Sequence, residues 1–175
     1  MELDELLESP YRFISHDDIV YLAGFLDGEG TFTVYCCEGT RGPVYSALIS
    51  AAGNDEVVMQ WLQKTFGGGL YRPKTKDDNR AQIVQWQIRN KELLIGLLPL
   101  LIEHLKTKKL QARLLLKYSV EYRDRSRGQT LSEEDIKLRN AYCTLFSDLN
   151  SVGKTSTAKK ATVTSLFASG EVALP

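Results

Sequence analysis

The chain lacks the features that mark several classes of protein. Its 175 residues contain three cysteines, Cys36, Cys37 and Cys143, and two histidines, His16 and His104, none of them at metal-ligand spacing. No apolar run reaches the roughly 18 residues of a membrane-spanning helix, and the acidic N-terminus carries no signal-peptide pattern. Three cysteines make no even disulfide set, so we expect a reducing, intracellular location without secretion.

An excess of charge of one sign is also missing, because 22 Lys and Arg balance 22 Asp and Glu. The acids are concentrated near the start: residues 1–30 contain eight acids and one base, Arg12. The remaining residues therefore carry 21 basic and 14 acidic side chains. Local fields rather than totals attract a polyanion, so neutrality does not exclude nucleic acid as a partner. So small a surplus does not by itself indicate one.

The most informative segment is residues 19–30, IVYLAGFLDGEG. Its first half has the character of an apolar helix, for which Asp17 or Asp18 can act as N-cap. Gly28 and Gly30 permit backbone conformations that a side chain would forbid, so we expect them to end the helix. Read alone, the segment is also consistent with a short amphipathic helix that ends in a glycine-rich cap.

Two further properties of this segment indicate function. Ala23 and Gly24 have little bulk, which lets another helix approach closely. Asp27 and Glu29 lie at the negative end of the helix dipole, which is unfavourable by some tenths of a kcal/mol unless a cation binds there.

Hydrophobic periodicity predicts an α+β domain in which helix, two strands, helix, two strands and further helices follow one another. We expect one four-stranded antiparallel sheet with helices on one face and C-terminal helices added. Asn54 and Asn90 are expected to cap helices, and Pro99 to kink or break one. The expected strands are 31–37, 45–51, 70–76 and 82–89, and the expected helices are 17–29, 57–66, 90 onward, 107–123, 131–149 and a short one near 166.

The other face of this sheet is expected to be polar and almost free of acids. Such a face is common on solvated sheets, but Arg, Lys, Gln, Thr and Tyr side chains also bond to base edges and phosphates. A two-stranded ribbon fits the major groove.

The nine residues 22–30, LAGFLDGEG, resemble position for position the signature of the LAGLIDADG homing endonucleases. The similarity continues through residues 66–69, 86–88, 105–111 and 148–155 and covers roughly residues 17–168. It implies an αββαββα domain with a saddle-shaped sheet, preceded by an arm at residues 1–16 and followed by a tail at 169–175. It also implies an organelle or a prokaryotic cytoplasm as the location.

In activity, the resemblance implies a site-specific homing endonuclease. One motif supplies one catalytic acid, Glu29, so cutting both strands of a long pseudo-palindromic DNA target implies a homodimer. Glu29 and the Gly28 carbonyl would bind Mg²⁺, with Mn²⁺ as an alternative and Ca²⁺ binding without cleavage. Lys108 matches a basic residue beside the catalytic centre, although Lys106 or Lys109 could take its role, or Lys108 could simply be a solvated residue at a helix start.

The resemblance also implies contact residues, with no membrane and no small-molecule substrate as partner. The dimer interface is expected to contain Leu22, Ala23, Gly24, Phe25 and Asp27. The side chains expected to contact DNA are Thr33, Tyr35, Arg41, Tyr45, Ser46, Arg72, Lys74, Lys76, Arg80, Gln85, Gln87, Arg89 and, at a phosphate, Lys154.

The chain departs from the family at residues 49–54, ISAAGN, where many members have a glutamine near the active-site water. Asn54 is a possible substitute. Two other functions therefore stay open: a cleavage-deficient module of the same fold, acting as an RNA maturase or a DNA-binding regulator, and a dimeric scaffold without nucleic acid. The intact Glu29 favours cleavage, and the acid-poor sheet face argues against the scaffold.

Overall fold

The computed structural model describes residues 10–40, 42–73, 83–122 and 130–151. The expected helix near residue 166 and the tail at 169–175 lie outside these ranges, as does most of the arm. The described elements are α2 (His16–Glu29), β1 (Gly30–Gly39), β2 (Gly42–Gly53), α3 (Glu56–Phe66), β3 (Gly69–Tyr71), β4 (Val84–Ile88), α4 (Lys91–His104), α5 (Lys109–Glu121) and α6 (Glu133–Asn150).

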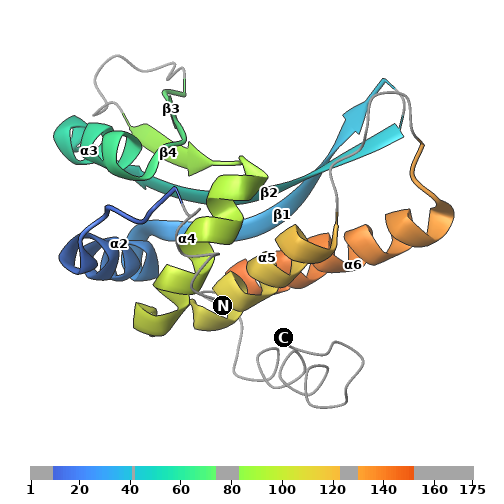
Figure 1. The fold of residues 1–175 in the computed structure, drawn as a ribbon. Coiled ribbons are helices and arrows are strands. Elements are labelled where there is room, and N and C mark those ends of the chain that lie inside the picture. The colour runs from blue at the N-terminus through green and yellow to red at the C-terminus, as the bar shows by residue number, and fades with distance from the viewer. Residues whose placement is uncertain (1–9, 41, 74–82, 123–129, 152–175) are drawn as a thin grey trace.

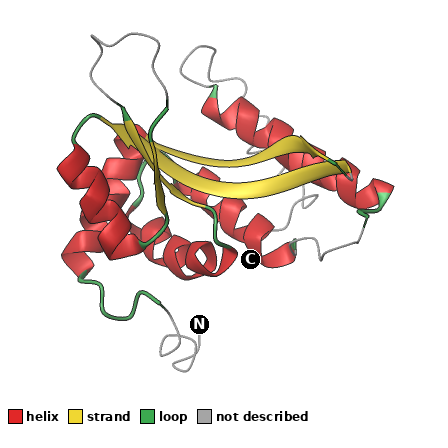
Figure 2. Ribbon diagram, turned by 90° about the horizontal axis from the view of Figure 1, so that it is seen from above, coloured by secondary structure: helices red, strands yellow, loops and turns green. Residues whose placement is uncertain are grey.

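The four strands form one antiparallel sheet in the order β1-β2-β4-β3. Figure 1 shows this sheet as a curved layer with α2, α4, α5 and α6 on one side, while α3 flanks the end that contains β3 and β4. Seen from above, the sheet lies across the helices and its other face is uncovered (Figure 2). The expected α+β class and element order are therefore confirmed.

The core fills the space between the sheet and the helices beneath it. Alternate residues of β1 and β4 point into it, among them Phe32 and Trp86, both fully buried. The indole of Trp86 also donates to the Gly67 carbonyl at 2.8 Å, where α3 ends. Leu22 and Leu26 of α2 belong to the same core, so the motif helix is held by its apolar face. None of the helices in the described ranges has the length and apolar content needed to cross a membrane.

Two of the expected helix caps were wrong. Ser15, rather than Asp17 or Asp18, accepts from an amide in the first turn of α2, and Asp55, rather than Asn54, caps α3. In both cases the side chain one turn ahead of the free amides is the one within reach.

Asn90 caps α4 as expected, and that helix continues through Pro99 without a break. Four buried leucines on α4 offset the hydrogen bond that proline removes.

The strands differ in length from the expected ones. The β1–β2 hairpin is longer than expected and pairs without interruption from Gly30 opposite Ala51 to Gly39 opposite Gly42. Strand β3 is shorter and ends at Tyr71. Pro73 follows two residues later, and because proline has no amide hydrogen it cannot continue a ladder.

The described part of the N-terminal arm packs against the domain. Tyr11 is only 5% exposed, and its hydroxyl donates to the Phe66 carbonyl at 3.1 Å. A side chain at Gly96 would contact the Tyr11 ring at 3.2 Å, so the small residue there leaves room for it. The packed domain therefore begins before residue 16.

We predict that Tyr11→Phe lowers the free energy of unfolding by about 1 kcal/mol, because the buried Phe66 carbonyl loses its donor while the ring volume is kept. Urea denaturation measures this. Replacing Phe13, whose side chain is 86% exposed, with Leu serves as the control and should change stability by less than about 0.5 kcal/mol. An unchanged urea midpoint for Tyr11→Phe would mean that the segment is only loosely attached.

Candidate metal site and nucleic-acid interface

The motif helix ends at its carboxylate. Glu29 is the last residue of α2 and is exposed, and Gly30 turns the chain directly into β1. Gly30 has φ −84° and ψ 156°, an extended conformation open to any residue. The expectation of a special glycine conformation at Gly28 or Gly30 was therefore wrong, since neither has a positive φ. Space explains Gly30, because a Cβ there would lie 2.6 Å from the Leu26 carbonyl oxygen.

Asp27 caps a helix other than its own. Its carboxylate accepts from the backbone amides of Lys106 at 2.7 Å, Thr107 at 3.1 Å and Lys108 at 3.0 Å, and from the Thr107 hydroxyl at 3.0 Å. These residues lead into α5, whose own N-cap residue, Lys108, makes no side-chain cap. Asp27 thus caps the entry to α5 from outside, by binding the N-cap amide and the two amides before it, across 80 residues of sequence.

The same contacts set the ionisation of Asp27. Partial burial opposes the charged form, but the hydrogen bonds from Lys106, Lys108 and Thr107 outweigh it, so the pKa of Asp27 lies below its ordinary value. These contacts give Asp27 a structural role at the start of α5. Its place in a dimer interface stays a prediction.

Lys108 makes the reverse connection. Its ammonium donates to the carbonyl oxygens of Leu26 at 2.9 Å, Gly28 at 3.3 Å and Gly30 at 2.6 Å. A cation at this position neutralises the negative end of the α2 dipole. Burial lowers the pKa of Lys108, although the negative charges of Asp27 and Glu29 act in the opposite direction. Lys108 is therefore not simply a solvated residue at a helix start, and its contribution to catalysis stays a prediction.

Two oxygen donors of this chain suit a hard divalent cation: the Glu29 carboxylate and the Gly28 carbonyl, which already accepts from Lys108. In the described part of the chain, no three His, Cys, Asp or Glu side chains lie close enough together to hold a metal ion. Mg²⁺ prefers oxygen ligands and completes its shell with water or phosphate. The donor type fits such an ion, and these two protein donors leave the rest of its shell to water or phosphate.

The uncovered sheet face carries the polar side chains. Residues directly opposite each other in antiparallel strands lie on the same face, and the register pairs Tyr35 with Ser46 and Ser50 with Gln87. Among the described strand residues of this face there is no carboxylate. The location of six expected contact residues on this face is confirmed, while their contact with DNA stays a prediction: Thr33, Tyr35, Ser46, Gln85, Gln87 and Arg89.

A small network on this face was missed by sequence reasoning. The Arg89 guanidinium donates two hydrogen bonds to the Gln87 side chain, at 2.7 and 3.2 Å, and lies 5.5 Å above the Tyr35 ring. Ser50 and Tyr71 also face this side, because they pair with Gln87 and Gln85. Strand alternation would have indicated Ser50, but only the register brings Tyr35 beside Arg89.

Tyr45 was wrongly expected to contact DNA. It lies one residue from Ser46 and therefore points to the opposite face, where it is 7% exposed. Its hydroxyl donates to the Asn140 side chain at 2.8 Å and so ties β2 to α6.

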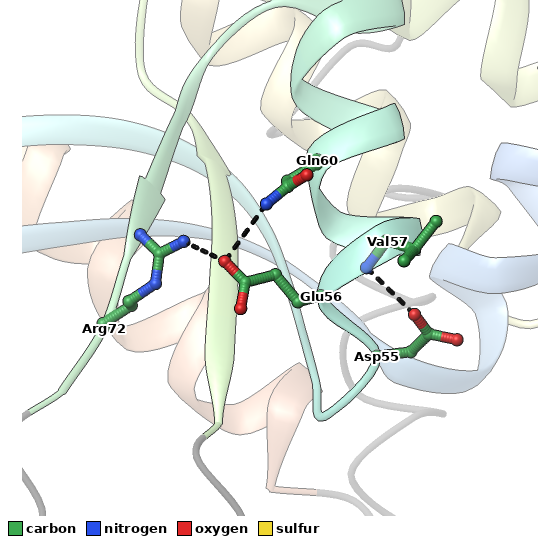
Figure 3. A network of polar contacts seen from close by, with 5 residues as sticks. All are labelled: Asp55, Glu56, Val57, Gln60 and Arg72. Atoms are coloured by element: carbon green, nitrogen blue, oxygen red, sulfur yellow. Dashed lines mark hydrogen bonds and ion pairs between the residues drawn. The ribbon is translucent and has the colours of Figure 1, made fainter.

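Arg72 was also expected on the polar face, but its side chain pairs with Glu56 at the start of α3. Figure 3 shows Arg72 and Gln60 both pointing toward the Glu56 carboxylate, beside the Asp55 cap. The hydrogen bond from Arg72 lowers the pKa of Glu56. An isolated strand pattern could not reveal this partner, because β3 ends before Arg72. The other expected DNA contacts, Arg41, Lys74, Lys76, Arg80 and Lys154, lie outside the described residues.

The free face of α2 differs from the expected one. Leu22 and Ala23 are fully buried in the core of this chain, so their side chains are unavailable to a second copy. The opposite stripe is formed by Val20, 41% exposed, Tyr21, 50% exposed, and Gly24. A helical period of 3.6 residues places these side chains on one face. Phe25 is half-buried beside Tyr21, with their rings stacked at 6.3 Å.

We predict that Asp27→Ala costs about 1 kcal/mol of stability at neutral pH, because the amides before α5 lose their cap. The folded-state pKa of Asp27 is depressed, so its contribution is present above the unfolded value of about 3.9 and is lost as the pH falls through the folded value. Urea melts between pH 7 and pH 3 should therefore show the two proteins converging in acid. Asp17→Ala, on the same helix, is the control, with a loss of only some tenths of a kcal/mol; a pH-independent difference would contradict the assignment.

Comparison with known proteins agrees with this geometry. The chain matches the family model described as LAGLIDADG endonuclease over residues 22–120, more than half its length. Among curated proteins, none matches it by sequence. Three solved homing endonucleases share its fold. I-CvuI, in complex with its target, is 16% identical, with a TM-score of 0.64 over 90% of this chain and 98% of that chain. I-TnaI is 24% identical, with a TM-score of 0.55 over 75% of this chain and 86% of that chain. The archaeal intron-encoded I-Vdi141I, complexed with DNA, is 17% identical, with a TM-score of 0.59 over 76% of this chain and 84% of that chain.

The family match includes the whole LAGFLDGEG segment at the end of α2 together with the four strands and α3 to α5 that follow it. The fold of the three solved structures agrees with that match. The chain therefore belongs to the LAGLIDADG endonuclease family and carries one copy of the motif in its 175 residues.

Proposed function

We propose that the protein is a homodimeric, site-specific DNA endonuclease that cuts both strands of a long pseudo-palindromic target with the help of Mg²⁺. One observation carries this proposal: the exposed Glu29 carboxylate stands directly before β1. Thr31, two residues later, is the first residue on the polar sheet face. The described strand residues of that face include no carboxylate. A carboxylate beside a surface suited to a polyanion repels phosphate unless a cation lies between them.

The sheet face has the chemistry to read a duplex. Gln85 and Gln87 can each donate and accept at base edges, and Arg89 suits a guanine. Thr33 and Ser46 offer hydroxyls that bond to bases or phosphates. The long β1–β2 hairpin is a two-stranded ribbon of the kind that enters a major groove. The solved I-CvuI and I-Vdi141I structures contain DNA, which supports the same partner here.

For cleavage, Glu29 and the Gly28 carbonyl would hold the cation. A bound Mg²⁺ would polarise the scissile phosphate and supply an activated water. The solved I-CvuI complexes were prepared with Mg or Ca, which supports a divalent ion. Lys108 would hold the end of α2 in place through its three carbonyl contacts and place positive charge beside the phosphate.

A second copy of the chain completes the site in this proposal. One Glu29 serves one strand, and cutting two strands calls for two. The stripe of Val20, Tyr21 and Gly24 offers an apolar, low-bulk helix surface for the partner. Beyond the backbone of its own turn, no atom of the described residues lies within 4 Å of the position where a Cβ of Gly24 would be, so this surface can accept a closely packed helix. Two-fold symmetry would then match the pseudo-palindrome.

Two observations favour a second function, binding without cleavage. The Gly28 carbonyl already accepts from Lys108, which reduces its capacity for a cation, and the usual glutamine is missing from residues 49–54. A protein of this kind would act as an RNA maturase or as a DNA-binding regulator.

We predict that Glu29→Gln abolishes cutting of a randomised pseudo-palindromic duplex library while leaving DNA binding intact. The amide keeps the shape but loses the charge that holds Mg²⁺. Cleavage products are sequenced with Mg²⁺ and with Ca²⁺, and Ca²⁺ should support binding without cutting. Glu134→Gln, an exposed change in the first turn of α6, should cut like the wild type.

The outcomes separate the two functions. Mg²⁺-dependent cutting of a few related sequences that is lost in Glu29→Gln establishes the endonuclease. Specific binding without cutting in either metal would favour the maturase or regulator instead. A protein that neither binds nor cuts would refute both.

We also predict that Gly24→Leu produces a folded monomer with weakened DNA binding. A Cβ at position 24 would meet no described atom beyond its own helical turn, but the leucine would prevent close helix approach, and replacing a helix glycine adds stability by up to about 1 kcal/mol. Light scattering coupled to size exclusion gives the mass, and a melting curve verifies the fold. Ala141→Leu, at an exposed site on α6, is the matched control; a dimeric Gly24→Leu would rule out this face of α2.

A further inference from the structure

A pocket of about 430 Å³ lies beside the first half of β2, away from Glu29 in sequence and topology. Strand β4 pairs with β2 only from Ile49 to Gly53. Between Pro43 and Ala47, β2 therefore faces the end of α5 and the start of α6, and the pocket opens there. Its volume is within the range of small-ligand sites.

The described residues that line this pocket are basic, aromatic, apolar or serine, and none of them is an acid. Arg89 and Lys91 come from the end of β4 and the start of α4, and Arg139 comes from α6. The Lys91 ammonium donates to the Tyr122 carbonyl at 3.2 Å, and the Arg139 guanidinium lies 5.0 Å from the Tyr122 ring centre. Packing thus holds basic side chains beside one partly desolvated space, where an anion would interact favourably with them.

Ser119 adds a hydrogen-bonding group to this pocket. It is 2% exposed, and its hydroxyl makes no hydrogen bond to any described residue. A buried hydroxyl without a partner costs free energy, so such groups are usually satisfied by a ligand, a water or an ion. Ser119 lines the pocket, and its O–H can therefore donate to an oxygen bound there.

We propose that this pocket binds a phosphate group through Lys91, Arg89 and Ser119, with Arg139 as its basic wall. The cations suit a multiply charged oxyanion, and the serine hydroxyl suits its oxygen atoms. The phosphate belongs either to a DNA backbone or to a free phosphate ester. Arg89 connects the two surfaces, since it also contacts Gln87 and Tyr35 on the open sheet face.

The test uses the full chain and inorganic phosphate at constant ionic strength, followed by amide chemical shifts in NMR spectra. Saturable shifts at Ser119 and Lys91 are expected. Lys91→Gln should weaken the apparent affinity by about tenfold or more, the loss that accompanies one charged hydrogen bond. Lys137→Gln, an exposed lysine on α6 that does not line the pocket, should bind like the wild type.

Shifts that stay linear in phosphate, or equal affinity in wild type and Lys91→Gln, would overturn the proposal. A melting curve verifies that each variant folds. If Lys91→Gln does not fold, Ser119→Ala removes a single oxygen and tests the same pocket, with weaker phosphate binding expected and unchanged binding as the contrary result.

A second arm identifies the source of the phosphate with a mixed-sequence DNA duplex and with AMP. For a DNA phosphate, Lys91→Gln should reduce the slope of log affinity against log salt by about one, and the duplex should displace inorganic phosphate. For a free ester, the slope is unchanged and AMP binds more tightly than inorganic phosphate. Neither arm uses a metal or cleavage, so failure here leaves the Glu29 proposal standing.

Discussion

The structure depends on a pair of reciprocal caps between the end of α2 and the start of α5. Asp27 accepts from the three amides that precede α5, and Lys108 donates to two carbonyls at the end of α2 and to that of Gly30, which follows it. Each helix end thus receives a charge of the sign that its dipole favours. Because these contacts join segments about 80 residues apart, they fix the direction in which α2 ends and so the position of Glu29.

The pairing register of the strands divides the sheet into a packed face and an open one. Pairing of β1, β2 and β4 puts Phe32, Ile49 and Ile88 in the core and leaves the intervening side chains above it. A slip of one residue would exchange the two sets. The polar surface proposed to read DNA is therefore maintained by the hydrophobic energy of the opposite face, and its residues can vary without disturbing the core.

Much of the fold could be predicted from local pattern. The motif helix, the strands expected at 31–37 and 45–51 and the Asn90 cap all depend on neighbours within a few residues. Errors arose where a partner was distant. The pairing of Arg72 with Glu56 was not expected because Glu56 belongs to another element, whereas alternation from the neighbouring Ser46 would already have placed Tyr45 on the packed face. His16 and His104 are not at metal-ligand spacing in the sequence, yet their ring centres lie 5.0 Å apart.

The sequence by itself determined the family, the single acidic motif and the αββαββα order, because these are written in contiguous residues and in periods of 2 and 3.6. Only the tertiary structure decided that Asp27 caps α5, that Lys108 holds the end of α2, and that Leu22 and Ala23 are core residues while Val20, Tyr21 and Gly24 are exposed. A hydrogen bond or a buried face is a relation between two segments, and its free energy exists only once chain folding has brought both together.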